Sequence, residues 1–121
     1  MKKMNKDIGN YGEKLACKYL SLNNHRIIDV NFRTKLGEID IISLHENILV
    51  FIEVKTRYNM DFGAAIESVN LSKQNKIKSV AKYYIFVNNL YNYNVRFDVC
   101  EVLLNYNNEG YKINHIEDAF R

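Results

Sequence analysis

The stretch GEIDIISLHENILVFIEVKTR, residues 37–57, carries two segments rich in Ile and Val on either side of a short polar break. Such β-branched segments are typical of strands, and residues 46–47 are a candidate two-residue turn between them. We therefore predict a β-hairpin with strands over residues 37–44 and 48–56. This hairpin decides the fold, and charged residues interrupt its apolar pattern at matching positions of both strands.

The register of the hairpin brings four charges together. A two-residue turn at residues 46–47 places Asp40 opposite Glu53 and Glu38 opposite Lys55. Because side chains alternate along a strand, all four project from one face, with the Cβ atoms of Asp40 and Glu53 about 5 Å apart. Both faces are otherwise apolar, so we expect both to be covered by other elements.

Two facing carboxylates repel each other, and partial burial strengthens the repulsion, so this pair needs a compensating cation or a shifted pKa. Lys55 supplies one positive charge. A divalent cation would supply two, and Mg²⁺ or Mn²⁺ prefers carboxylate oxygens with open positions for water and phosphate. The alternative is an ion network of Glu38, Asp40, Glu53 and Lys55 that only ties the strands together. The apolar surroundings favour the metal site.

The segments outside the hairpin complete an α/β pattern. Helical periodicity runs over about residues 6–23, through an apolar stripe of Ile8, Tyr11, Leu15, Tyr19 and Leu22. Further strands are predicted over residues 26–33, 95–103 and 111–116. A second helix runs from a candidate N-cap at Ser72 to about residue 88. The order αβββαββ predicts a mixed sheet of about five strands flanked by helices, within a single domain over residues 1–121.

The composition narrows the function classes. With 47% hydrophobic residues the chain is typical of a folded domain, and a net charge of +3 is small for a protein that only coats nucleic acid. No apolar stretch is long enough to span a bilayer, and two distant cysteines fit a reducing cytoplasm, so we expect a cytoplasmic protein that does not bind membranes. The three histidines, at 25, 45 and 115, show no metal-ligand spacing, and we assign them no role.

Five motifs in the chain resemble the YraN-like family of bacterial proteins. They are Gly12-Glu13, Asn31-Phe32-Arg33, residues 37–40, residues 51–57 and Arg96-Phe97-Asp98. That family is similar to the PD-(D/E)xK nuclease superfamily, and its closest likeness there is to the archaeal Holliday junction resolvases. The resemblance covers nearly the whole chain and implies a restriction-endonuclease-like fold.

The resemblance also implies roles for site residues. The motif aspartate of the superfamily maps to Asp40, and its (D/E)xK pair maps to Glu53 and Lys55. The helical acidic residue of the resolvase-like branch maps to Glu13. Ile39 stands where the superfamily motif has a proline, a residue that coordinates nothing. Asp40 and Glu53 are then expected to hold Mg²⁺ or Mn²⁺, and Lys55 to orient the attacking water or stabilise the transition state. Glu13 would complete the metal shell; alternatively it is a surface residue favoured near a helix N-terminus.

Phosphate contacts require cations around the carboxylates. The candidates are Arg33, Lys35, Arg57 and Lys73, each of which has the alternative of a solvated surface charge. Lys76, Lys78 and Lys82 are interpreted as a solubility feature. Tyr83 and Tyr84 are interpreted as core or loop aromatics, and the segment with Gly63 and Glu67 as a loop beside the site.

Two function classes follow. The first is a metal-dependent endonuclease that hydrolyses phosphodiester bonds in DNA, with branched or flapped DNA suggested by the resolvase likeness. The second is a catalytically silent nuclease-fold protein that binds nucleic acid or a protein partner. The complete set of Asp40, Glu53 and Lys55 favours the first class. By analogy with resolvases, a homodimer is a further expectation.

Overall fold

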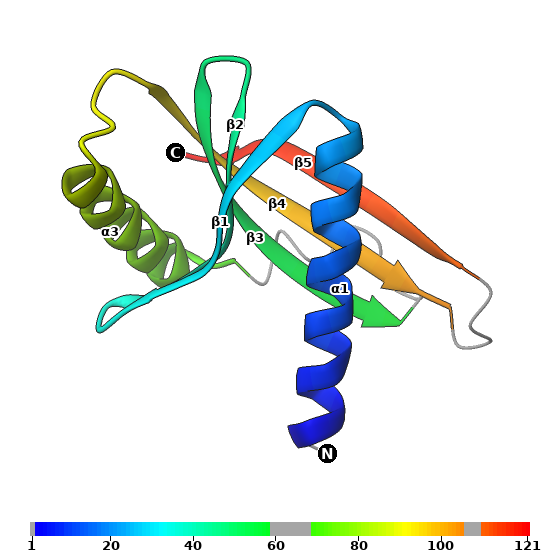
Figure 1. Ribbon diagram of the computed structural model, residues 1–121. Coiled ribbons are helices and arrows are strands. Elements are labelled where there is room, and N and C mark those ends of the chain that lie inside the picture. The colour runs from blue at the N-terminus through cyan, green and yellow to red at the C-terminus, as the bar shows by residue number, and fades with distance from the viewer. Residues whose placement is uncertain (1, 59–68, 106–109) are drawn as a thin grey trace.

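The computed structural model describes residues 2–58, 69–105 and 110–121. The elements, in chain order, are α1 (Lys2–Leu22), β1 (His25–Thr34), β2 (Gly37–His45), β3 (Ile48–Tyr58), α3 (Leu71–Asn88), β4 (Asn94–Leu104) and β5 (Tyr111–Phe120) (Figure 1). This is the predicted order, and the predicted α/β class is confirmed. The segment with Gly63 and Glu67 lies outside the described residues.

The five strands form one sheet in the order β1-β2-β3-β4-β5. Strands β3 and β4 are parallel, whereas β1–β2, β2–β3 and β4–β5 are antiparallel. A parallel pair needs a crossover connection, and the described part of the connection between β3 and β4 contains α3. The sheet is therefore mixed, as the sequence predicts.

Helices α1 and α3 cover different faces of the sheet. Leu49 and Phe51 of β3 belong to a core that includes Val80 of α3. The alternating residues Val50 and Ile52 belong to a second core, with Ala16 and Leu20 of α1. Because successive side chains of a strand point to opposite faces, both faces of the hairpin are covered, as predicted. The charged end of the hairpin thus lies between two apolar layers.

The register of the hairpin agrees with the prediction. Pairing runs from His45 opposite Ile48 to Ile41 opposite Ile52. Glu46, the first turn residue, has a φ of 54°, in the left-handed region. One position beyond Ile41 and Ile52, this register brings Asp40 and Glu53 side by side.

Helix α1 packs against the sheet through only part of the predicted stripe: Ile8, Leu15 and Tyr19 pack against the core. Tyr11 and Leu22 are 51% and 74% exposed, whereas Ala16 and Leu20 are fully buried. The reason is Gly12, where an added Cβ would stand 2.7 Å from Cβ of Thr56 on β3. A glycine at this crossing lets the helix lie closer to the strand than any side chain would permit, which turns the neighbouring small residues inward.

The N-cap of α3 is Asn70, not the predicted Ser72. Asn70 has an extended backbone, and its side-chain Oδ1 accepts a hydrogen bond of 2.9 Å from the backbone N–H of Lys73. Asparagine is as favourable an N-cap as serine, so the sequence alone does not distinguish the two. This two-residue shift places Lys73 in the first turn of the helix. None of the described helices is long and apolar enough to cross a membrane.

Candidate functional site

The site centres on Asp40 of β2 and Glu53 of β3, which are only 7% and 8% exposed. Oδ2 of Asp40 accepts a hydrogen bond of 2.8 Å from the backbone N–H of Val54. This bond continues the hairpin past its last paired residues with a side chain in place of a backbone carbonyl. It fixes the Asp40 carboxyl group directly beside Glu53.

The neighbouring Glu53 perturbs the carboxyl group of Asp40. Burial, and then the negative charge of Glu53, raise the pKa of Asp40 to about 8, against the opposing effect of the Val54 N–H. A hydrogen bond between the two carboxyl groups also favours the protonated form. A strongly raised carboxyl pKa in a cleft is typical of functional sites, because a fold gains no stability from two buried like charges.

Two lysines from different elements lie beside the carboxylates. Nζ of Lys73 stands 3.4 Å from Oε1 of Glu53. Burial, then a hydrogen bond and repulsion from Lys73, lower the pKa of Lys55. Burial alone would lower the pKa of Lys73 too, but the charge of Glu53 and the hydrogen bond to Lys55 raise it. The two neighbouring amines thus shift in opposite directions: the pKa of Lys55 is lowered and that of Lys73 is raised.

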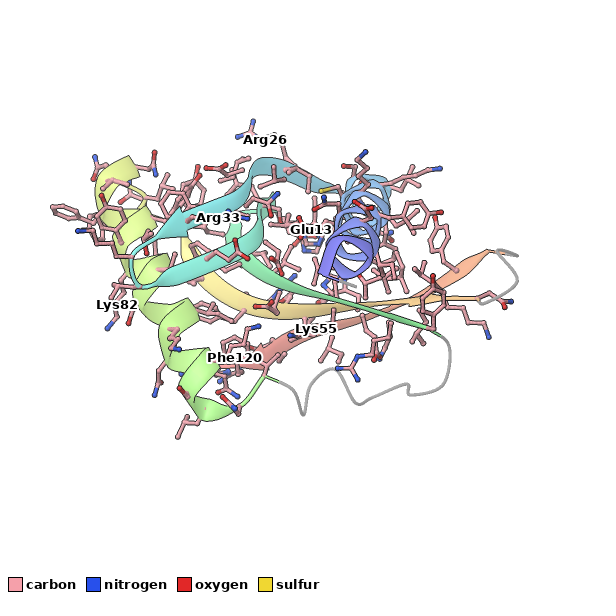
Figure 2. All side chains as sticks on the ribbon, turned by 90° about the horizontal axis from the view of Figure 1, so that it is seen from below. Glu13, Arg26, Arg33, Lys55, Lys82 and Phe120 are labelled. Atoms are coloured by element: carbon pink, nitrogen blue, oxygen red, sulfur yellow. The ribbon has the colours of Figure 1, made fainter. Side chains whose placement is uncertain are left out.

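Glu13 reaches the site from α1. Glu13 follows Gly12, whose close contact with Thr56 brings this part of α1 against β3, the strand that carries Glu53 and Lys55 (Figure 2 labels Glu13 and Lys55). Burial raises the pKa of Glu13, a hydrogen bond with Asn31 lowers it, and the charges of Glu38 and Glu53 raise it further. The charge of Glu13 in turn acts on Asp40. The structure thus brings all four candidate catalytic residues into one electrostatic cluster.

A cleft of about 410 Å³ opens in front of Glu53. Its described lining consists of Gly37, Glu38, Glu53, Asn70, Ser72, Lys73, Lys76 and Ile77. The start of α3 forms one wall, and the positive end of a helix dipole favours a phosphate. Oxygen donors beside such a cleft suit Mg²⁺ or Mn²⁺, which keep water and phosphate as their remaining ligands.

The donor set is small. Among residues 2–58, 69–105 and 110–121, no group of three or more His, Cys, Asp or Glu side chains is arranged to hold a metal ion. Asp40 and Glu53 therefore fit an ion that takes two protein carboxylates and completes its shell with solvent and substrate. They do not fit a closed structural metal site.

The four candidate phosphate contacts divide into three groups. Lys73 lines the cleft, and Arg33 and Lys35 line a neighbouring groove at the β1–β2 turn. Arg57 is half-buried on β3, outside the described lining of both hollows. Nε of Arg33 pairs at 2.7 Å with Oε2 of Glu38. Glu38, predicted to face Lys55, therefore has its closest charged partner on β1.

Lys76, interpreted as a solubility residue, is exposed and also lines the cleft together with Lys73. The two lysines are three positions apart on a helix, a spacing that brings side chains to one face. That spacing is visible in the sequence and could have identified Lys76. Tyr84 is a core residue as predicted, whereas Tyr83 is 49% exposed.

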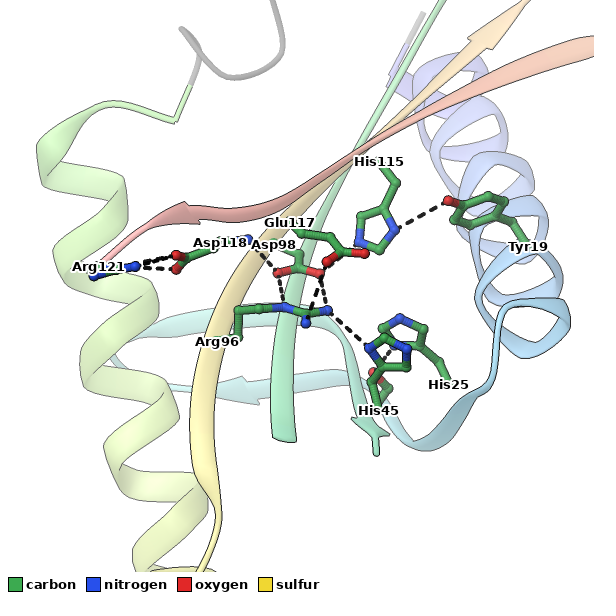
Figure 3. Close-up of polar contacts among 10 residues, drawn as sticks. Tyr19, His25, His45, Arg96, Asp98, His115, Glu117, Asp118 and Arg121 are labelled. Atoms are coloured by element: carbon green, nitrogen blue, oxygen red, sulfur yellow. Dashed lines mark hydrogen bonds and ion pairs between the residues drawn. The ribbon is translucent and has the colours of Figure 1, made fainter. Parts of the chain in front are cut away.

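A second polar cluster was not anticipated from the sequence. The three histidines come together at the opposite end of the hairpin (Figure 3), where the rings of His25 and His45 stack with centroids 4.1 Å apart. Nε2 of His115 lies 2.7 Å from Oδ2 of Asp98, and Nε of Arg96 lies 2.9 Å from Oδ1 of the same residue.

Asp98 is fully buried at the centre of this cluster. Besides Arg96 and His115, it accepts a hydrogen bond of 3.0 Å from the backbone N–H of Asp118 on β5. Burial alone would raise the pKa of Asp98, but these three bonds lower it overall. A buried, fully paired carboxylate that joins β4 to β5 is a structural element, which accounts for the Arg96-Phe97-Asp98 motif.

The fold and the site together define an α/β protein in which a hairpin holds two buried carboxylates side by side, and one of them, Glu53, lines a cleft together with Lys73 and Lys76. Residues 12–102, which span all five sequence motifs, match the family described as Uncharacterised protein family UPF0102. The chain belongs to this family.

Its similarity to relatives extends from end to end. The UPF0102 protein of Clostridium botulinum is 60% identical over 121 residues, covering 100% of this chain and 99% of the relative. The Clostridium beijerinckii relative is 55% identical over 100% of this chain and 98% of its own length. The Clostridium acetobutylicum relative is 46% identical over 100% of this chain and 99% of its own length. The predicted YraN-like membership is confirmed.

Proposed function

We propose that this protein is a Mg²⁺- or Mn²⁺-dependent endonuclease that hydrolyses phosphodiester bonds in DNA. The observation that carries the proposal is the pair of buried carboxylates, Asp40 and Glu53, held together beside an open cleft. Two such groups repel when both are ionised, and burial together with this repulsion raises the pKa of Asp40 to about 8, so their arrangement suits a cation better than it suits the fold. The resemblance of the hairpin to the PD-(D/E)xK motif supports the same assignment.

Each residue of the site has a role in this proposal. Asp40 and Glu53 hold the cation, with Asp40 oriented by the Val54 N–H. A divalent ion would supply a lowered pKa for an attacking water and a counter-charge for the developing negative charge. Lys55, which lies close enough to Glu53 and Asp40 to feel the charge of both, is suited to orient the attacking water or to stabilise the transition state.

The substrate phosphate is held by the start of α3. Lys73, in the first turn of this helix, and Lys76 both line the cleft. They offset the repulsion between a polyanion and the acidic pair. Lys73 pairs with Glu53 in the absence of substrate and is close enough to move to a phosphate oxygen when a cation takes its place. Glu13 adds negative charge on the α1 side of the cation.

The test is DNA cleavage by purified protein with Mg²⁺ or Mn²⁺, on linear duplex, flapped and four-way substrates. We expect cleavage of at least one substrate, lost with EDTA and in Glu53→Gln. The matched control is Glu46→Gln, which changes an exposed residue of the hairpin turn and should cleave like the wild type. Equal cleavage by Glu53→Gln would point to a contaminating nuclease, and no cleavage of any substrate would contradict the proposal.

The second candidate function is binding without cleavage. The ion pair of Lys73 with Glu53 favours it, because a lysine can neutralise the acidic pair permanently. In that case the cleft would bind nucleic acid or a protein partner, and divalent ions would change neither stability nor affinity. Binding of the same substrates without cleavage, unaffected by Mn²⁺, would support this alternative.

A further inference from the structure

A groove of about 380 Å³ lies at the tip of the β1–β2 hairpin, separate from the cleft. Its lining residues are Arg33, Thr34, Lys35, Leu36 and Tyr83. The first four belong to the hairpin tip and the last to α3. Tyr83 is 49% exposed and Leu36 is 58% exposed. The groove thus combines a flat aromatic ring, an apolar side chain and two cations.

The ring of Tyr83 is held in place from behind. Phe32 stacks on it with centroids 6.4 Å apart and an angle of 25° between the planes. Phe32 in turn packs edge-on against the buried Tyr84, at 4.8 Å. An aromatic ring supported by a second one loses little conformational entropy when a ligand stacks on it. Such a surface is suited to a flat, aromatic ligand.

The cations of the groove favour a ligand that also carries phosphate. Lys35 is exposed at the hairpin tip. Arg33 pairs with Glu38, but the two side chains are 73% and 45% exposed, and such a surface pair is weak enough to exchange for another anion. Flat aromatic rings joined to phosphates are the chemistry of nucleotides, and exposed aromatics beside cations bind single strands.

The groove and the cleft are neighbours along α3. Lys76 lines the cleft and Tyr83 lines the groove. Between them the hairpin tip rests on the helix, where an added Cβ at Gly37 would stand 3.6 Å from Val80. Lys76, Val80 and Tyr83 follow helical spacing along one face. The seven helical steps from Lys76 to Tyr83 span about 10 Å, a distance that a strand of a few nucleotides covers.

We propose that this groove binds an unpaired base of the substrate strand, stacked on Tyr83, a few nucleotides from the phosphate in the cleft. The inference rests on the proposed nuclease function and narrows its substrate class to DNA with a single-stranded segment. Duplex DNA keeps its bases stacked inside the helix and offers none to Tyr83. The groove therefore favours flapped, branched or single-stranded DNA over a blunt duplex.

The first test uses the absence of tryptophan from the chain. Tyr83→Trp introduces one fluorescent reporter into the groove, and Tyr111→Trp places the same reporter on β5 as a matched control. Both are titrated with oligothymidylate and with a blunt duplex, in EDTA so that nothing is cut. We expect quenching by the single strand in Tyr83→Trp only. Equal quenching in both variants, or none in Tyr83→Trp, would overturn the inference.

The second test measures affinity in the same buffer. Tyr83→Ala should weaken binding of the single strand about tenfold, with the duplex affinity unchanged and Tyr83→Phe close to the wild type. Lys35→Ala should weaken binding and reduce its salt dependence, whereas the matched Lys112→Ala should not. Unchanged single-strand affinity in Tyr83→Ala would overturn the inference. It would also be overturned if the protein bound no oligonucleotide but formed a concentration-dependent dimer that Tyr83→Ala abolishes.

These outcomes are separable from the proposed nuclease function. If cleavage depends on Glu53 but Tyr83→Ala does not change binding, the proposed nuclease function is supported and the proposed role of the groove is contradicted. If single-strand binding depends on Tyr83 but no DNA is cleaved in Mn²⁺, the role of the groove is supported and the nuclease function is contradicted.

Discussion

The ammonium group of Lys73 lies 3.4 Å from Oε1 of Glu53, so a cation already stands beside the carboxylate that the proposed metal requires. A lysine in the first turn of a helix is unfavourable for the helix dipole. Its position is explained by the acidic pair, which it partly neutralises. Lys73 and a divalent ion therefore compete for Glu53.

This competition predicts the effect of Lys73→Met. Removal of the ammonium group should strengthen Mn²⁺ binding about threefold to fivefold in the absence of DNA, the scale of a partly exposed ion pair. DNA affinity and cleavage should fall, because the same lysine contacts the phosphate. Titration calorimetry measures the first effect. Lys82→Met, on the exposed side of α3, is the control; unchanged or weaker Mn²⁺ binding by Lys73→Met contradicts the competition.

The raised pKa of Asp40 predicts that the site costs stability without a metal. Since the pKa is about 8 in the folded state against an ordinary value of 3.8, the stability associated with Asp40 is complete below pH 3.8 and is lost as the pH rises through 8. Asp40→Asn removes this loss and keeps an acceptor for the Val54 N–H. In EDTA at pH 8 it should raise the melting temperature by about 5 °C or more.

The same variant should not respond to Mn²⁺. Mn²⁺ that binds only the folded state raises the melting temperature of the wild type by mass action. In Mn²⁺ the wild type should therefore melt at a higher temperature than Asp40→Asn, the reverse of their order in EDTA. Well below pH 3.8, at about pH 3 or lower, where Asp40 is protonated in both the folded and the unfolded state, the two should melt alike. A destabilised Asp40→Asn in EDTA, or an equal Mn²⁺ response, would count against the account.

The contact of α1 with β3 predicts opposite effects for two glycines of one helix. Gly12→Ala drives a methyl group into Thr56 and should lower the free energy of unfolding by about 1–3 kcal/mol. Gly9→Ala has no atom within 4 Å of the new methyl group and should raise it by about 0.5–1 kcal/mol through helix propensity. Urea unfolding distinguishes them, and equal effects of the two substitutions would refute the close approach.

The histidine cluster predicts acid sensitivity. Burial, followed by the charges of His45, His115 and Arg96, lowers the pKa of His25 to about 4, although Asp98 opposes this. Because the unfolded value is higher, near 6.5, the stability associated with neutral His25 is present above pH 6.5 and is lost as the pH falls towards 4.

We expect a loss of about 1 kcal/mol between pH 7 and 5. The measurement compares His25→Gln with its parent in an Asp40→Asn background, which removes the opposite pH dependence of Asp40. The histidine-containing protein should lose stability more steeply on acidification. Parallel curves would mean that His25 is protonated at no cost.

The hairpin was the most predictable part of the molecule. A polar two-residue turn between apolar strands determined its register, and the register alone brought Asp40 beside Glu53. The α/β order followed from the change of hydrophobic period along the chain. These features are local, and local patterns are what a sequence displays directly.

The features that the sequence did not reveal depend on contacts between distant elements. His25 lies opposite His45 only because a bulge between Ile27 and Asp29 shifts the register of β1. The pairing of Lys73 with Glu53 depends on where α3 crosses the sheet, and the buried stripe of α1 depends on contact between Gly12 and Thr56. None of these contacts has a periodic signature.

Mn²⁺ binding tests the central claim, that Asp40 and Glu53 form a divalent cation site, most directly. Calorimetric titration at neutral pH in the absence of DNA should detect one site in the wild type and in Glu46→Gln, and none in Glu53→Gln. Binding of Mn²⁺ by Glu53→Gln with the wild-type affinity, or by none of the three proteins, would contradict the claim.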